Sequence, residues 1–156
     1  MFQSIFFTTT LLCVAVFGQQ EPQGDVILRW NDEALNQVRT QRLGAFDAAR
    51  AYALLNVAMF DAANGVDGRR ARFNEALVAP PNRRSARRNR PNRMAAVSAA
   101  ANEVLSQLFP ESTDAFDFIL DDIVDGLGGS TNTRVRRGLR LGESVGSEVI
   151  AVGSTD

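Results

Sequence analysis

Three aspartates have a spacing that could bind a metal ion. Asp121, Asp122 and Asp125 form an Asp-Asp-x-x-Asp pattern in a segment that we expect to be helical. Carboxylates at positions i, i+1 and i+4 can converge on Mg²⁺, which would in turn bind the oxygens of a diphosphate substrate. Aspartates on the exposed side of an amphipathic helix are common. We therefore favour a solvated acidic face over a Mg²⁺–diphosphate enzyme.

Arginine is concentrated in a second segment, at about residues 67–92, which the prolines Pro80, Pro81 and Pro91 predict to be a loop. Nine arginines fall between residues 69 and 93, against one acid. Their guanidinium groups could bind a polyanion, and the candidate residues are Arg83, Arg84, Arg87, Arg88 and Arg90. Aromatic residues are almost absent from the segment, so specific nucleic-acid recognition by base stacking is not expected. A solvated loop is favoured, and a stand-alone polyanion- or partner-binding helical module is the alternative function.

The composition of the 156 residues excludes several kinds of chemistry. The chain has no histidine, and all 17 basic residues are arginine, so lysine is absent as well. Histidine general bases, histidine metal ligands, lysine Schiff bases and the phosphate-binding lysine of nucleotide-binding loops are therefore excluded. The formal net charge of −1 predicts no general attraction to nucleic acids or membranes.

The first 18 residues are typical of a secretory signal peptide. Met1–Gly18 contains no charged side chain, and its most apolar stretch, Leu11–Phe17, is too short to span a bilayer. Val16 and Gly18 are small residues at the positions that precede a cleavage site. We expect a secreted, extracellular protein without a transmembrane segment. The only cysteine, Cys13, would be removed with the signal, so the mature chain would have no disulfide.

The remaining residues, 19–156, are predicted to form a single all-α domain of about five helices in a bundle-like array. No alternating strand pattern occurs, whereas apolar residues recur at helical spacing. The helix over Phe46–Asn64 is the most hydrophobic, so we expect it to be central and buried on all sides, with Gly65 as its C-cap. The other expected helices are one after an N-cap at Asn31, one over Met94–Phe109 after a cap at Asn92, one over Ser112–Leu127 and one over Asn132–Val152.

Four blocks of sequence resemble the N-terminal helical region of vanadium-dependent haloperoxidases, which belong to the type 2 phosphatidic acid phosphatase-like superfamily. They occur in the expected order and span most of the predicted mature chain. The blocks are Val26–Asn31 with Ala34–Leu35 and Val38–Arg39; Ala49–Arg50 with Ala58–Ala62, Asn64 and Asp67–Gly68; Ala95–Ala101 with Val104–Leu105 and Leu108–Pro110; and Gly138 with Leu141–Glu143 and Val145.

The resemblance implies halide oxidation by peroxide for full-length relatives, at a vanadate ion held by a histidine and caged by lysine, arginine, serine and glycine. The motifs that carry these residues lie C-terminal to the matched region. Arg83-x6-Arg90-Pro91 resembles the first motif, Lys-x6-Arg-Pro, but has arginine for lysine and lies upstream of its place. Asn56 stands where many relatives have histidine. We therefore assign no catalytic residue and no cofactor to this chain.

These observations lead to one favoured hypothesis, a secreted non-catalytic helical domain equivalent to the N-terminal part of such an enzyme. Gly138, Gly142 and Gly146 lie four apart and form a smooth strip that another helix could approach. In an isolated domain we expect this strip and the Phe46–Asn64 helix to remain partly open. That expectation predicts self-association or binding to a C-terminal catalytic half.

Overall fold

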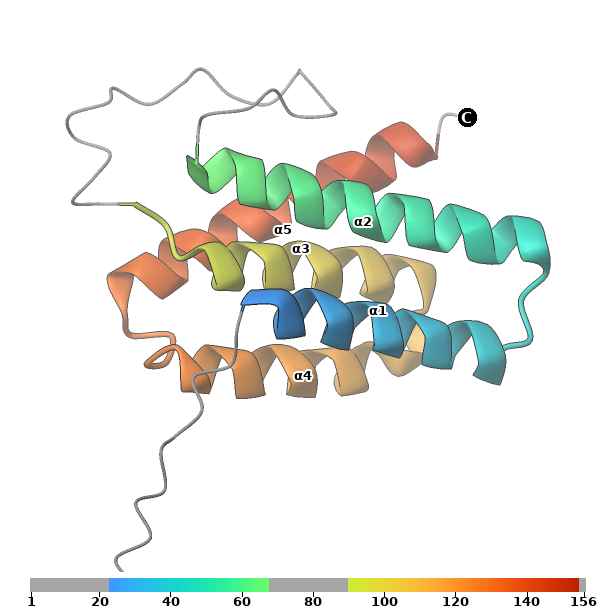
Figure 1. Cartoon of the computed structure of the whole chain (residues 1–156), viewed down its shortest axis with the longest axis horizontal. Helices are drawn as coiled ribbons and strands as arrows, with labels where there is room; N and C mark the ends of the chain where they lie inside the picture. Colours follow the sequence, from blue (N-terminus) through green and yellow to red (C-terminus); the bar gives the residue numbers. More distant parts are fainter. Residues whose placement is uncertain (1–22, 68–89, 155–156) are drawn as a thin grey trace, which may run out of the picture.

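The computed structural model describes residues 23–67 and 90–154, and it confirms the all-α fold class in these ranges. Five α-helices and one short 3₁₀ helix are present, and the described residues include no strand (Figure 1). The predicted signal peptide, residues 1–18, lies outside the described residues. The helices are α1 (Gln23–Thr40), α2 (Ala45–Asp67), α3 (Arg93–Leu108), η1 (Pro110–Ser112), α4 (Thr113–Gly126) and α5 (Thr133–Gly153).

Successive helices run in alternating directions, so that α3 and α5 run the same way (Figure 1). Helix α3 contacts each of the other four α-helices and is the centre of the bundle. Ten of its 16 residues are buried, including every residue from Ala95 to Asn102. The prediction that the Phe46–Asn64 helix is central was wrong. Phe46 in α2 is 93% exposed and Phe60 is 49% exposed, because one side of α2 faces solvent.

The close packing of α3 on α5 depends on small side chains. A Cβ atom added at Gly138 would lie 2.5 Å from the Asn92 carbonyl oxygen, and one at Gly146 would lie 2.6 Å from the Cβ of Glu103. One at Gly142 would clash with the Ala96 carbonyl oxygen. The three glycines therefore let the two helix backbones meet directly. The expectation that this strip remains open was wrong, because α3 of the same chain covers it.

Helix α1 buries one face against this centre. Val26, Trp30, Ala34 and Gln37 are buried and recur every three or four residues, which places them on one side of the helix. Trp30 is completely buried and belongs to the same core cluster as Leu55 of α2. Leu28, on the opposite side of the helix, is exposed.

Two predicted helix boundaries were wrong. Asn31 lies inside α1, where its amide donates a hydrogen bond to the Ile27 carbonyl (2.9 Å), one turn earlier. It therefore does not cap a helix. Gly65 lies inside α2, which continues to Asp67. Asparagine often starts a helix and glycine often ends one. Here the helix continues through both residues, because packing against neighbouring helices stabilises the longer helix.

The later boundaries follow the prediction. The Asn92 side chain accepts a hydrogen bond from the Ala95 amide (3.1 Å) and caps α3, and Asn132 accepts one from the Arg134 amide (3.0 Å) at the start of α5. Between α4 and α5, Gly128 and Gly129 have positive φ angles of 96° and 77°, which glycine adopts readily. On α4, the apolar residues at helical spacing are buried or partly buried (Phe116, Ile119, Leu120, Ile123 and Val124), as is Leu127, which follows the helix.

Candidate functional site

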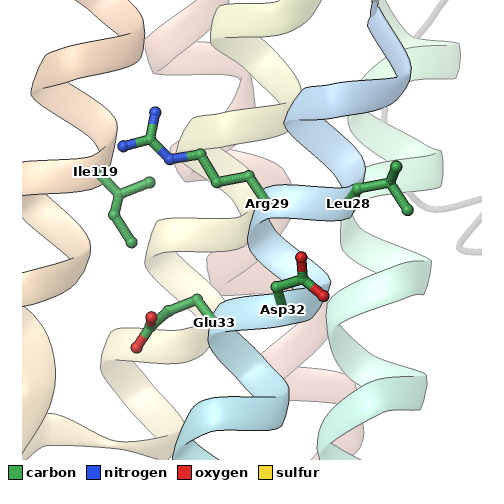
Figure 2. Close-up of a pocket in the computed structure, with 5 residues that line it drawn as sticks. All are labelled: Leu28, Arg29, Asp32, Glu33 and Ile119. Carbon is green, nitrogen blue, oxygen red and sulfur yellow. The ribbon is translucent and has the colours of Figure 1, made fainter.

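A shallow groove on the described surface runs between α1 and α4 and has a volume of about 580 Å³. It is lined by Leu28, Arg29, Asp32, Glu33 and Ile119 (Figure 2). Leu28 and Asp32 lie one turn apart on α1, and so do Arg29 and Glu33. A single stretch of α1 therefore provides most of the lining. Figure 2 shows the side chains of Arg29 and Glu33 pointing from α1 towards α4.

Two of the three charged side chains that line the groove, Arg29 and Glu33, already have partners. Arg29 donates to the Asp122 carboxylate at 2.6 Å, and the two side chains are 41% and 59% exposed. The Glu33 carboxylate accepts a hydrogen bond from the side-chain amide of Gln37 at 2.8 Å. An exposed ion pair of this kind ties α1 to α4 but contributes little stability. The lining residues include no nucleophile paired with a base, so no catalytic role is assigned to the groove.

The Asp-Asp-x-x-Asp motif does not form a metal site in the structure. Asp121, Asp122 and Asp125 are all exposed on α4, and Asp122 is paired with Arg29. Within the described ranges, no group of three or more histidine, cysteine, aspartate or glutamate side chains could hold a metal ion. No metal site is therefore assigned to these three carboxylates.

The arginine-rich segment is described only at its C-terminal end. Arg83, Arg84, Arg87 and Arg88 lie outside the described residues. The Nε of Arg90 donates to the Val66 carbonyl at 3.2 Å, near the end of α2. The Arg90 carbonyl accepts from the Nε of Arg134 at 3.2 Å. Arg90 therefore connects α2 to the start of α5.

These residues do not fit a vanadate ion. The sequence has no histidine to bond vanadium and no lysine to neutralise the oxyanion. Arg90, which stands at the arginine of the Lys-x6-Arg-Pro pattern, points its Nε at a backbone carbonyl. Asn56, at the position where many relatives have histidine, donates to the Asn31 side chain (3.1 Å) and to the Tyr52 carbonyl (2.9 Å). No catalytic step is therefore assigned to these residues.

Buried polar side chains connect the helices. The side-chain amide of Asn102 donates to the carboxylate of Asp117 in α4 at 2.8 Å. The Ser112 hydroxyl donates to the side-chain carbonyl of Gln37 in α1 at 2.9 Å. Asp61 of α2 is completely buried. These contacts join α1, α3 and α4 around the end of the bundle where η1 lies, and their role is structural.

The structure also shows a basic surface that was not among the candidate sites from the sequence. Arg134, Arg136, Arg137 and Arg140 lie in the first two turns of α5, and no acid occurs in α5 before Glu143. The backbone amide of Asn92 donates to the Arg134 carbonyl at 2.8 Å. This bond places Arg93, the first residue of α3, beside the first turn of α5. A count of charges along residues 134–140 could have found this surface.

Comparisons with known proteins identify no relative. No protein-family model, curated protein or solved structure matches the chain. None of the helices in the described ranges is long and apolar enough to cross a membrane. The function must therefore be argued from the residues and their contacts.

Proposed function

We propose that this chain is a non-catalytic helical domain of a secreted protein of the vanadium-dependent haloperoxidase type. One observation supports the proposal: several residues on which the sequence resemblance rests also hold the bundle together. Trp30 and Asp61 are completely buried, and Gly138 and Gly142 make the backbone contact between α5 and α3.

The blocks also lie on helices that pack on one another. They fall on α1, α2, α3 and α5, and α3 contacts the other three. The packing of α3 on both α2 and α5 supports a scaffold that keeps its shape without a cofactor. In the proposed role, these helices support a catalytic part that provides the histidine and lysine absent here.

The chemistry of the proposed family is therefore assigned to residues beyond this chain. Vanadate, where bound, supplies a Lewis-acidic centre for peroxide. The partner in this proposal is a C-terminal catalytic half. The glycine strip cannot be its contact surface, because α3 already covers it.

The decisive test is the sequence of the transcript and of the genomic DNA downstream of the codon for Asp156. A continuous reading frame that encodes Lys-x6-Arg-Pro, Pro-Ser-Gly-His and Ser-Arg-x5-His motifs is the expected result. A stop codon, or a frame without these motifs, would overturn the proposal.

A biochemical test follows from the same proposal. The purified chain, given vanadate, bromide and peroxide, should not oxidise bromide, whereas the longer protein should. In the longer protein, Gly142→Val should abolish activity by separating α3 from α5, and Gly126→Ala should leave activity unchanged, because a Cβ at Gly126 would meet no atom within 4 Å. Full activity of the Gly142→Val enzyme would contradict a supporting role for these helices.

A further inference from the structure

The outer side of α2 carries an apolar stripe that the bundle leaves open. Phe46, Ala49, Ala53 and Phe60 follow one another at spacings of three, four and seven residues, which places them within about 60° of one another around the helix. All four are exposed, and the exposed fractions of Phe46 and Phe60 are 93% and 49%. Ala62, on the opposite side of α2, is completely buried. The stripe therefore faces away from the core.

One end of the stripe projects, and the other end lies in an apolar patch. Phe46, in the first turn of α2, is almost fully exposed. Phe60 lies beside α1, because Asn56, one turn earlier, donates to the side chain of Asn31 at 3.1 Å and the two helices run in opposite directions (Figure 1). Ile27, one turn before Asn31, therefore lies next to Phe60, and it is 42% exposed. Phe60 and Ile27 together form a surface that can receive an apolar side chain.

We propose that a second copy of this chain covers the stripe, with the two α2 helices antiparallel about a two-fold axis at Ala53. Phe46 lies seven residues before Ala53, and Phe60 lies seven residues after it. In such a pair, each Phe46 meets the patch of Phe60 and Ile27 on the other copy, and each Ala53 meets its counterpart. The small side chains of Ala49 and Ala53 let the two backbones approach between the aromatic contacts. The dimer goes beyond the proposed function and does not depend on it.

The charges on α2 are compatible with this contact. No charged side chain of residues 46–60 lies on the stripe itself. Arg50, the nearest one, is about 60° around the helix from Ala53, and its Nη2 donates to the Gly153 carbonyl of α5 at 2.6 Å. This bond directs the guanidinium towards α5 and away from the second copy. Dimerisation therefore buries apolar side chains without placing an unpaired charge at the interface.

The exposed area is sufficient for a small, reversible dimer. A phenylalanine covers about 150–250 Å², so Phe46 and Phe60 at their exposed fractions would bury roughly 200–350 Å² in each copy. Neighbouring side chains that are exposed or partly exposed add to this area (Ile27, Leu28, Ala49, Ala53, Asn56 and Val57). Two copies would then approach the ~1,200 Å² at which stable specific interfaces begin. Interfaces of this size associate weakly, so we expect monomer and dimer to coexist at micromolar concentrations.

The first test is the oligomeric state of the full chain. Sedimentation equilibrium should show a monomer–dimer equilibrium for the wild type. Phe46→Ser should raise the dissociation constant by about tenfold or more, because each dimer loses two phenylalanine contacts. This variant should still fold, as checked by circular dichroism, since the side chain is exposed. The matched control, Phe118→Ser, changes a 73% exposed phenylalanine of α4 and should leave the equilibrium unchanged.

A second test locates the two-fold axis by cross-linking. In a Cys13→Ser background, an engineered cysteine is the only thiol of the chain. Ala53→Cys should form a disulfide-linked dimer on mild oxidation, because residue 53 meets its counterpart. Ala49→Cys is the matched control on the same exposed side of α2. It should not cross-link, since the two copies of residue 49 would lie about 12 Å apart along the helix pair.

Several results would overturn the proposal. One is a wild-type chain that stays monomeric at every concentration. Another is an equal effect of F46S and F118S, or equal cross-linking of A53C and A49C, which would assign association to another surface. A monomeric chain whose binding to phosphatidylcholine vesicles is lost in F46S would assign the stripe to lipid. A monomeric chain whose binding to a C-terminal catalytic half is lost in F46S would assign it to that partner.

Discussion

Two contacts between helices in this molecule are made in different ways. Helices α3 and α5 meet through glycine and alanine, so that a methyl group at Gly142 has no space. Helices α1 and α4 are separated by an open groove and connected by the Arg29–Asp122 ion pair, whose side chains remain half exposed. The first contact depends on shape and tolerates no added atom. The second depends on charge in water, where long side chains can move apart and be replaced by solvent.

The largest expected effect comes from Gly142→Val. The new side chain would overlap the Ala96 carbonyl and the Ala99 methyl group, so α5 would have to move away from α3. We expect a loss of about 3 kcal/mol or more in the free energy of unfolding, measured by urea denaturation followed by circular dichroism. Gly126→Ala is the matched control, and because its Cβ would lie in open space it should be neutral or stabilising by about 0.5–1 kcal/mol. Equal stability of the two variants would show that the helices do not meet as described.

A smaller effect is expected at the cap that begins α3. Asn92→Ala removes the hydrogen bond from the Ala95 amide but keeps the backbone bond to Arg134. The free energy of unfolding should fall by about 1 kcal/mol, a typical value for an N-cap. Asn92→Asp should retain most of the stability, because aspartate caps helices as well as asparagine does. A loss as large as that of Gly142→Val would mean that Asn92 has a further role in the contact with α5.

The smallest effect is expected at the ion pair. A double-mutant cycle with Arg29→Gln and Asp122→Asn should give a coupling energy of roughly 0.2–1 kcal/mol at low salt. The coupling should approach zero at high salt, because exposed charges are screened. Urea denaturation of the four proteins at two salt concentrations provides the measurement. A coupling that persists at high salt would indicate that α1 and α4 approach more closely than the open groove shows.

The sequence predicted the number of helices and several of their boundaries well. Asn92 was predicted as the cap of α3, because an asparagine side chain can accept a hydrogen bond from a free amide, and the last helix was predicted to begin at about Asn132. The start of α1 was predicted nine residues too late, because a cap at Asn31 would make Asp32 the first helical residue, whereas α1 begins at Gln23. Asn31 is a good capping residue, but its side chain has another partner one turn earlier in α1.

The choice of the central helix could not be made from hydrophobicity. Helix α2 contains large apolar residues, including Phe46 and Phe60, yet those two are exposed. Helix α3 is rich in alanine, which adds little to a hydrophobicity sum but allows neighbours to approach on several sides. Similarly, the sequence predicts that the glycine strip of α5 is a contact surface, but the helix that covers it, α3, belongs to the same chain. Spacing along a helix shows which face is smooth and does not show what covers it.

The central position of α3 has a consequence for hydrogen exchange. Because α3 touches all four other α-helices, its amides between residues 95 and 105 cannot reach water unless the surrounding helices separate. These amides should therefore be the slowest of the chain to exchange, at a rate set by the global unfolding equilibrium. Amides on the exposed side of α4 should exchange through smaller, local openings. Exchange measured residue by residue would thus order the five helices by the number of neighbours each must lose before it opens.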